Sequence, residues 1–255
     1  MRTKYIIGNW KMHGDKSSTQ VLLTQLSQAH ISRSTRVHMV VCPPFVFLEP
    51  TQKALLDSAI AWGAQNVCSE PIGAYTGEIS ASMLQAFGCQ YVLIGHSERR
   101  ILYHEDAEQL AKKIEQAVAC GIRPVFCVGE TLQQYQAGET QAVLTQQIQD
   151  VLKKLDPILF QTALLAYEPV WAIGSGISAR PEQVQAVHQF LRQQVAFYDV
   201  ALAQELAILY GGSVKAANAR ALFSAPDVDG ALVGGASLVA SEFLQIYEQC
   251  LSTSV

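Results

Sequence analysis

The sequence predicts a closed (β/α)8 barrel, in which eight parallel strands are surrounded by the helices that connect them. Short apolar runs recur eight times along the 255 residues, and segments with helical periodicity separate them. The runs are apolar throughout instead of alternating with polar residues, which is typical of parallel strands buried on both faces. Eight such units in a chain of this length match the barrel in count and size. A doubly wound open sheet is the structural alternative.

The expected elements alternate along the chain. The expected strands span Lys4–Gly8, Arg36–Cys42, Ile60–Ala64, Tyr91–Ile94, Arg123–Cys127, Thr162–Tyr167, Leu206–Tyr210 and Gly230–Val233. The expected helices include Ser18–Ala29, Asp106–Cys120, Glu139–Leu155, Pro181–Tyr198, Lys215–Phe223 and Ser241–Cys250. No linker, low-complexity run or change of composition divides the chain. We therefore expect residues 1–255 to form a single (β/α)8 barrel domain.

Composition and charge limit the possible classes of protein. Hydrophobic residues make up 49% of the chain and charged residues 16%, yet the longest apolar runs are far shorter than a membrane-spanning helix of roughly 20 residues. The net charge of −4 comes without a basic stripe, which argues against a nucleic-acid partner. Six cysteines lack any C-x-x-C spacing, which predicts reduced thiols. We expect a cytoplasmic protein with neither membrane nor nucleic-acid partners.

One stretch, Ala166–Ala179, combines a carboxylate with a possible cover. Glu168 follows an expected strand, and Pro169 rules out further strand pairing. Bulky apolar residues come next, followed by Gly174-Ser175-Gly176, which suits a lid whose backbone can bend and approach a ligand closely. A carboxylate beside such a lid indicates a proton transfer that must be protected from water.

Glycine-rich turns follow the last two expected strands, at Gly211-Gly212-Ser213 and Gly234-Gly235-Ala236-Ser237. A turn of this kind that leads into a helix leaves backbone N–H groups directed at one point, where they can bind a phosphate. The loops after strands seven and eight are also the usual phosphate site of barrel enzymes. Lys11, which follows the first expected strand, could add a positive charge toward the same anion.

His96 follows the fourth expected strand and precedes Ser97-Glu98-Arg99-Arg100, a possible start of a short helix. The positive end of that helix would disfavour the imidazolium form and keep the ring neutral. A neutral ring can donate its N–H to a carbonyl oxygen. Together with Glu168 as base, His96 provides the minimum needed to move a proton next to a carbonyl group.

Other motifs in the sequence lack the context that their chemistry requires. The run Gly174–Ala179 fits the dinucleotide fingerprint G-x-G-x-x-A, but it does not follow its strand directly. The run Gly95–Arg99 resembles a nucleophile elbow without the closing glycine. No spacing of metal ligands is evident, so we expect no metal, and metal-dependent aldolase chemistry remains a weak alternative. A phosphate-ligand-binding barrel without catalysis is the alternative from a different functional class.

Seven short motifs, distributed over the whole chain, resemble the triosephosphate isomerase family. They are Asn9-Trp10-Lys11, Ala64-Gln65-Asn66-Val67, Gly73-Ala74-Tyr75-Thr76-Gly77-Glu78, Gly95-His96-Ser97-Glu98-Arg99-Arg100, Ala166-Tyr167-Glu168-Pro169-Val170-Trp171, Tyr210-Gly211-Gly212-Ser213 and Leu232-Val233-Gly234-Gly235-Ala236-Ser237. Each motif is several residues long, and all occur in the order and at the spacing of the family. The resemblance implies an isomerase that interconverts dihydroxyacetone phosphate and D-glyceraldehyde 3-phosphate through an enediol, without a cofactor.

The resemblance also implies a role for each residue that matches a motif. Glu168 would be the base that moves the proton between the carbon atoms. His96 would be the neutral electrophile that polarises the carbonyl and moves protons between the two oxygens of the enediol. Lys11 and Asn9 would contact the substrate. Four residues would bind the phosphate through backbone N–H groups, namely Gly174, Ser213, Gly234 and Gly235.

The remaining implied roles are supporting ones. Glu98 and Glu130 would lie behind the substrate-contacting residues and organise Lys11 and the neighbouring loops, and Ser97 would contact the ligand's rim or the short helix without acting as a nucleophile. The resemblance further implies a homodimer, formed through the loops around His13 and Thr76.

The sequence departs from the family pattern at three positions. In the lid, Ile177 replaces the usual lysine and Arg180 replaces the usual threonine, so we expect altered lid kinetics without loss of activity. In the loop after Lys11, His13 replaces the usual asparagine.

Overall fold

The computed structural model describes residues 2–29, 31, 36–173 and 178–253. It contains eight parallel strands that pair in chain order and close, with β8 next to β1. The strands are β1 Lys4–Asn9, β2 Val37–Cys42, β3 Ile60–Ala64, β4 Tyr91–Ile94, β5 Arg123–Val128, β6 Leu164–Tyr167, β7 Ile208–Tyr210 and β8 Gly230–Val233. This closed sheet confirms the predicted (β/α)8 barrel.

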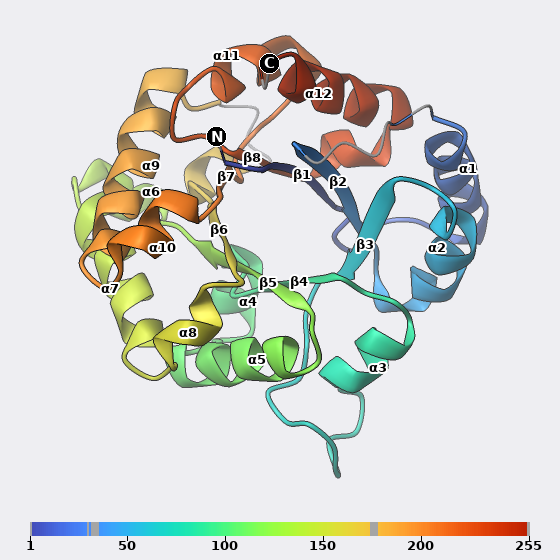
Figure 1. The fold of residues 1–255 in the computed structure, drawn as a ribbon, viewed down its shortest axis with the longest axis horizontal. Helices are drawn as coiled ribbons and strands as arrows, with labels where there is room; N and C mark the ends of the chain where they lie inside the picture. Colours follow the sequence, from blue (N-terminus) through green and yellow to red (C-terminus); the bar gives the residue numbers. More distant parts are fainter. Residues whose placement is uncertain (1, 30, 32–35, 174–177, 254–255) are drawn as a thin grey trace.

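Helices surround the barrel on its outside (Figure 1). The α-helices are α1 Lys16–Ser27, α2 Leu48–Leu55, α3 Ala81–Ala86, α4 Ser97–Leu102, α5 Ala107–Ala119, α6 Leu132–Gln136, α7 Thr140–Leu152, α8 Pro157–Phe160, α9 Pro181–Ala196, α10 Val200–Glu205, α11 Ala216–Phe223 and α12 Ala240–Ser252. Three 3-10 turns, η1 Phe45–Phe47, η2 Val170–Ala172 and η3 Gly235–Leu238, lie in loops that follow strands. Many of these helices begin with a side chain that accepts a backbone N–H, such as Asp15, Asp106 and Thr131.

The boundaries differ from the sequence prediction mainly where short helices intervene. The sixth strand begins at Leu164 instead of Thr162, because the chain first forms α8. The seventh begins at Ile208 instead of Leu206, because Leu206 closes the end of α10. The long helix expected at 139–155 ends at Leu152.

Two groups of buried side chains form the core, and they follow the alternation of side chains along a strand. One group fills the inside of the barrel and includes Tyr5, Ile7, Leu164 and Ala166. The other, larger group packs between the strands and the helices, and includes Ile6. The strands are therefore buried on both faces, which explains their continuously apolar sequences.

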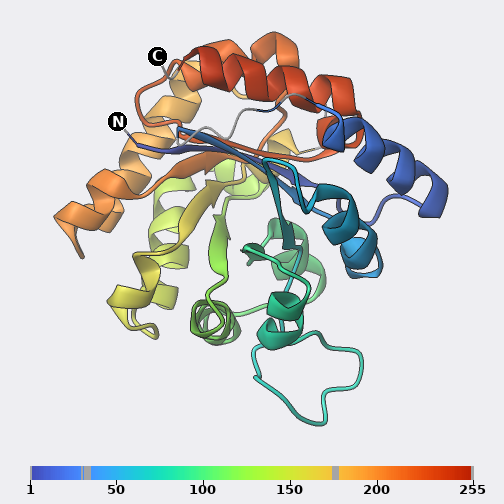
Figure 2. The same ribbon diagram turned by 45° about the vertical axis from the view of Figure 1, so that its right-hand side comes forward.

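The loop between β3 and α3, residues 65–80, projects from the body of the molecule (Figure 2). A backbone hydrogen bond of 2.8 Å from Cys68 N to Ile79 O closes the base of this loop. Among the described residues, no helix is long and apolar enough to cross a membrane.

Candidate active site

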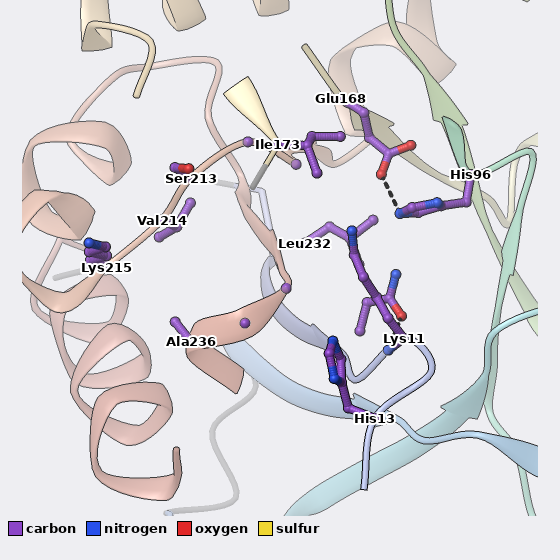
Figure 3. Close-up of a pocket in the computed structure, with 15 residues that line it drawn as sticks. Lys11, His13, His96, Glu168, Ile173, Ser213, Val214, Lys215, Leu232 and Ala236 are labelled. Atoms are coloured by element: carbon purple, nitrogen blue, oxygen red, sulfur yellow. Dashed lines mark hydrogen bonds and ion pairs between the residues drawn. The ribbon is translucent and has the colours of Figure 1, made fainter. Parts of the chain in front are cut away.

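A cavity of about 390 Å3 opens at the carboxyl ends of the strands (Figure 3). Its lining consists of Asn9, Lys11, His13, His96, Glu168, Ile173, Gly211, Gly212, Ser213, Val214, Lys215, Leu232, Gly234, Gly235 and Ala236. The loops after strands one, four, six, seven and eight thus meet at one place, where a (β/α)8 barrel carries its chemistry.

Two of the polar residues continue the inward-facing rows of their strands. In β1, Tyr5 and Ile7 face into the barrel, so the next side chain of the row is Asn9. In β6, Leu164 and Ala166 lead in the same way to Glu168. The apolar rows below these residues exclude water, and both polar side chains remain buried at 5% and 2% exposure.

Glu168 contacts His96 directly. The Nε2 atom of His96 lies 2.9 Å from Oε1 of Glu168, and the backbone N–H of Ser97 donates to Oε2 at 2.9 Å. Both carboxylate oxygens therefore have a donor although the side chain is buried. The structure places Glu168 and His96 at the same rim of the barrel, where they form a pair.

The other ring nitrogen of His96 identifies its tautomer. His96 precedes α4, and its Nδ1 accepts the backbone N–H of Glu98 at 3.2 Å. Because an accepting nitrogen carries no proton, the single N–H of a neutral ring must be on Nε2, where it donates to Glu168. Burial is the largest single influence and lowers the pKa of His96, but the charge and hydrogen bond of Glu168, together with the Glu98 carboxylate, outweigh it, and the net direction is upward. The Glu98 N–H opposes protonation at Nδ1.

The Glu168 carboxylate is held in its charged form although it is buried. Burial raises its pKa, but His96, the Ser97 amide and Lys11 outweigh that effect and lower it. Glycine at 211 leaves room for the side chain, because a Cβ there would lie 2.8 Å from Cγ of Glu168. Glycine is also required at position 129, where the backbone passes close to that of Glu168. A Cβ there would lie 1.8 Å from the Glu168 carbonyl oxygen.

Lys11 adopts a left-handed backbone conformation with φ of 51°, which is uncommon for a residue other than glycine. The Asn9 side chain accepts the Lys11 N–H at 3.0 Å, and the Gln65 side chain donates to the Lys11 carbonyl at 2.9 Å. The ammonium group pairs with Glu98 at 2.6 Å. These contacts direct a positive charge into the cavity from the side opposite Ser213 and Lys215 (Figure 3).

The glycine-rich turns after β7 and β8 present backbone donors to the cavity. Ser213, Gly234 and Gly235 line it, and their backbone N–H groups donate to no other residue that the structure describes. These three donors and the nearby Lys11 suit a small anion. The fourth predicted phosphate ligand, Gly174, lies outside the described residues.

Comparison with known proteins bears on the whole chain. The sequence profile of the family described as Triosephosphate isomerase matches residues 4–250. A triosephosphate isomerase from Cupriavidus necator is 52% identical over 246 residues, which cover 96% of this chain and 99% of the relative. One from Coxiella burnetii is 48% identical over 250 residues, 98% of each chain. This chain belongs to the triosephosphate isomerase family.

Glu98 and Glu130 hold different parts of the site. Both have supporting roles according to the resemblance to the triosephosphate isomerase family. Glu98 pairs with Lys11, as described above. Glu130 is fully buried, and its Oε1 accepts from the hydroxyl of Tyr167 at 3.0 Å and from Nε1 of Trp171 at 2.9 Å. Burial raises the pKa of Glu130, while both hydrogen bonds oppose the shift. Glu130 thus connects the residues on either side of Glu168 and does not contact Lys11.

Several residues at the site of this triosephosphate isomerase family member were not predicted from the sequence. His13 and Lys215 both line the cavity, although neither was predicted to lie at the site. Their positions shortly after the Lys11 and Ser213 motifs were the available signal. The hydroxyl of Tyr210 accepts the N–H of Ala179 at 3.3 Å and so ties the expected lid to the end of β7.

Of the two lid substitutions, Ile177 lies outside the described residues. Arg180 is exposed and precedes α9, where its N–H donates to Gln183 at 3.0 Å. Within the described residues, the His, Cys, Asp and Glu side chains form no group of three or more that could hold a metal ion.

Proposed function

We propose that this protein is a triosephosphate isomerase, which interconverts dihydroxyacetone phosphate and D-glyceraldehyde 3-phosphate in glycolysis and gluconeogenesis. Membership of the family supports this function. The observation that carries the proposal is the pair of a buried carboxylate, Glu168, and a histidine whose N–H is fixed on Nε2. A base and a neutral donor in contact are what a proton transfer next to a carbonyl requires.

The reaction moves one proton between two carbon atoms and requires no cofactor. The Glu168 carboxylate takes a proton from C1 of dihydroxyacetone phosphate, and the C–H electron pair forms the C1–C2 double bond of an enediolate. His96 moves the proton of the C1 hydroxyl to the oxygen on C2, which leaves the negative charge on the oxygen on C1. Glu168 then returns its proton to C2, where the electron pair of the C1–C2 double bond forms the new C–H bond, while the oxygen on C1 becomes the aldehyde carbonyl. Between the two steps Glu168 is a neutral carboxylic acid. Burial disfavours this neutral form less than it disfavours the charged carboxylate.

His96 stabilises the charge that develops on the substrate oxygens. Its Nε2–H donates to Glu168 in this structure, so the substrate carbonyl must take the place of the carboxylate as acceptor. This exchange releases Glu168 toward the carbon atoms. It also removes the carboxylate that raises the pKa of His96, which favours the neutral ring during the reaction. A fixed donor in a buried site stabilises an oxyanion strongly, because it needs no reorganisation.

The phosphate group positions the substrate. Its ligands are the backbone N–H groups of Ser213, Gly234 and Gly235. The N–H group of Gly174, which lies outside the described residues, is the fourth proposed ligand. Asn9 and Lys11 contact the rest of the substrate, with Lys11 supplying positive charge. The expected lid, of which residues 174–177 lie outside the described structure, would exclude water and so protect the enediolate from losing its phosphate.

The protein is a cytoplasmic homodimer of single-domain subunits. The loops around His13 and Thr76 form the interface, and their exposed apolar side chains support this. Met12 is 95% exposed, Ile72 87% and Tyr75 47%, and the latter two belong to the loop that projects in Figure 2. Exposed apolar side chains on a projecting loop are typical of a surface that another chain covers. Sedimentation of the purified protein tests the dimer.

A coupled assay tests the activity. Glyceraldehyde 3-phosphate is supplied, and the dihydroxyacetone phosphate that forms is reduced by glycerol 3-phosphate dehydrogenase, so that loss of NADH reports turnover. We expect turnover well above a control without this protein. The alternative, a phosphate-ligand-binding barrel without catalysis, predicts binding of glycerol 3-phosphate with no turnover.

A further inference from the structure

Tyr135 of α6 stacks on the indole of Trp171, which lies in η2 shortly after Glu168. The ring centroids are 4.4 Å apart, and the ring planes differ by 26°. Tyr135 is 38% exposed, so it is not a residue of the barrel core. The aromatic contact instead fastens the beginning of the segment between β6 and α9 to a helix outside the barrel.

The hydroxyl of the same tyrosine reaches the other end of that segment. Gln183, in the first turn of α9, donates from Nε2 to the Tyr135 hydroxyl at 3.1 Å. The other atom of the Gln183 amide, Oε1, accepts the Arg180 N–H at 3.0 Å. Gln183 thus orients the backbone at the start of α9, and Tyr135 orients Gln183.

The start of the segment is also connected to the catalytic carboxylate. Trp171 donates to Glu130, which accepts from Tyr167 as well, and Tyr167 directly precedes Glu168. A cavity of about 180 Å3 lies beside these groups, and Tyr135, Trp171, Ala179 and Gln183 are among the residues that line it. The cavity leaves space into which the side chains at both ends could shift if Tyr135 did not hold them.

We propose that Tyr135 is a positioning residue that holds both ends of the segment between β6 and α9 in place for substrate binding. Its ring fixes the Trp171 end, and its hydroxyl fixes the Arg180 end through Gln183. Ile173, two residues after Trp171, lines the substrate cavity. A ligand that contacts a side chain already held in place has less conformational entropy to remove. Tyr135 therefore acts on affinity and not on the chemical step. This inference rests on the proposed isomerase function.

The test compares KM, kcat and the Kd of glycerol 3-phosphate, which has no carbonyl and cannot react. Replacing Tyr135→Ala removes both contacts and should raise KM and Kd by roughly tenfold, while kcat stays within about twofold. Tyr135→Phe keeps the aromatic stack and loses only the Gln183 contact, so a rise of about two- to threefold is expected. Tyr198→Ala is the matched control, because Tyr198 is 41% exposed but follows the opposite end of α9.

Other outcomes would overturn the inference. If Tyr135→Ala has the same KM and Kd as Tyr198→Ala, Tyr135 does not position the segment. A loss of kcat with unchanged KM and a lower melting temperature would indicate a role in folding alone. If Tyr135→Ala does not fold, the Tyr135→Phe variant decides, and wild-type affinity in it contradicts the proposal. Absence of turnover in the wild type would instead refute the isomerase function, while Kd would still test Tyr135.

Discussion

Nε2 of His96 and Oε1 of Glu168 are 2.9 Å apart, so the two side chains that the proposed reaction needs are already in contact before substrate binds. The Glu98 N–H fixes the tautomer of the ring, and the Ser97 N–H holds the second oxygen of the carboxylate. Both donors belong to the first turn of α4. The short helix α4 therefore orients both side chains of the pair through its backbone N–H groups. The substrate has only to replace Glu168 as the acceptor of the His96 Nε2–H.

The position of the carboxylate depends on the glycine at 211. In Gly211→Ala, the new Cβ would lie 2.8 Å from Cγ of Glu168 and would displace it. We expect kcat to fall on the order of 10²-fold, because a shift of about 1 Å can cost that much. In the matched variant Gly235→Ala the Cβ would meet no atom within 4 Å, so kcat should be retained and any loss should be in KM. Equal kcat values in the two variants would refute this placement.

If Lys11 supplies positive charge to the substrate as proposed, removing that charge should weaken substrate binding. Lys11→Met should raise KM on the order of 10- to 100-fold, because hydrogen bonds to charged groups contribute about 1.5–3 kcal/mol. Glu98→Gln keeps the ammonium group and removes its partly exposed partner, so KM should change by less than about fivefold. Steady-state kinetics of both variants provide the measurement, and a Lys11→Met enzyme with the KM of Glu98→Gln would argue against this role.

The burial of His188 predicts that the fold loses stability in acid. Burial lowers its pKa to about 4, against 6.5 for the model compound, and its Nδ1 lies 3.0 Å from the carbonyl oxygen of Asp227. The unfolded chain therefore binds a proton first, so this contribution to stability is complete above pH 6.5 and is lost as the pH falls toward 4. Between about pH 7 and pH 5 the loss amounts to roughly 2 kcal/mol.

Urea unfolding at fixed protein concentration measures this effect. The free energy of unfolding of His188→Gln should be lower at neutral pH, because a buried contact is altered, but it should fall less between pH 7 and pH 5 than in the wild type. A variant with the same pH dependence as the wild type would assign the acid sensitivity to other groups.

The barrel could be predicted because each strand is apolar on both faces, and all eight strands lie within two residues of their predicted positions. Short helices such as α2, α8 and α10 could not be predicted, because one or two turns contain too few residues to show a helical period. Their absence from the prediction is also the reason why β6 and β7 were expected to begin two residues too early.

The site was predictable where a residue ends a strand, and less so where a loop decides its direction. Asn9 and Glu168 continue inward-facing rows, so the period of the strand places them. His13 lies in a loop, and its direction into the cavity follows from the backbone around Lys11, with its positive φ. The contact between Tyr135 and Trp171 joins two short elements far apart in the sequence, which no local pattern indicates.

The central claim is that Glu168 is the base, and Glu168→Asp tests it most directly. The variant keeps the charge but withdraws the carboxylate by one methylene group. We expect kcat to fall by a factor on the order of 10² to 10⁴, the usual contribution of a positioned base. The Kd of glycerol 3-phosphate should stay within about threefold, because the phosphate ligands are unchanged. A kcat within tenfold of the wild type, with unchanged Kd, would contradict the assignment of Glu168 as the base.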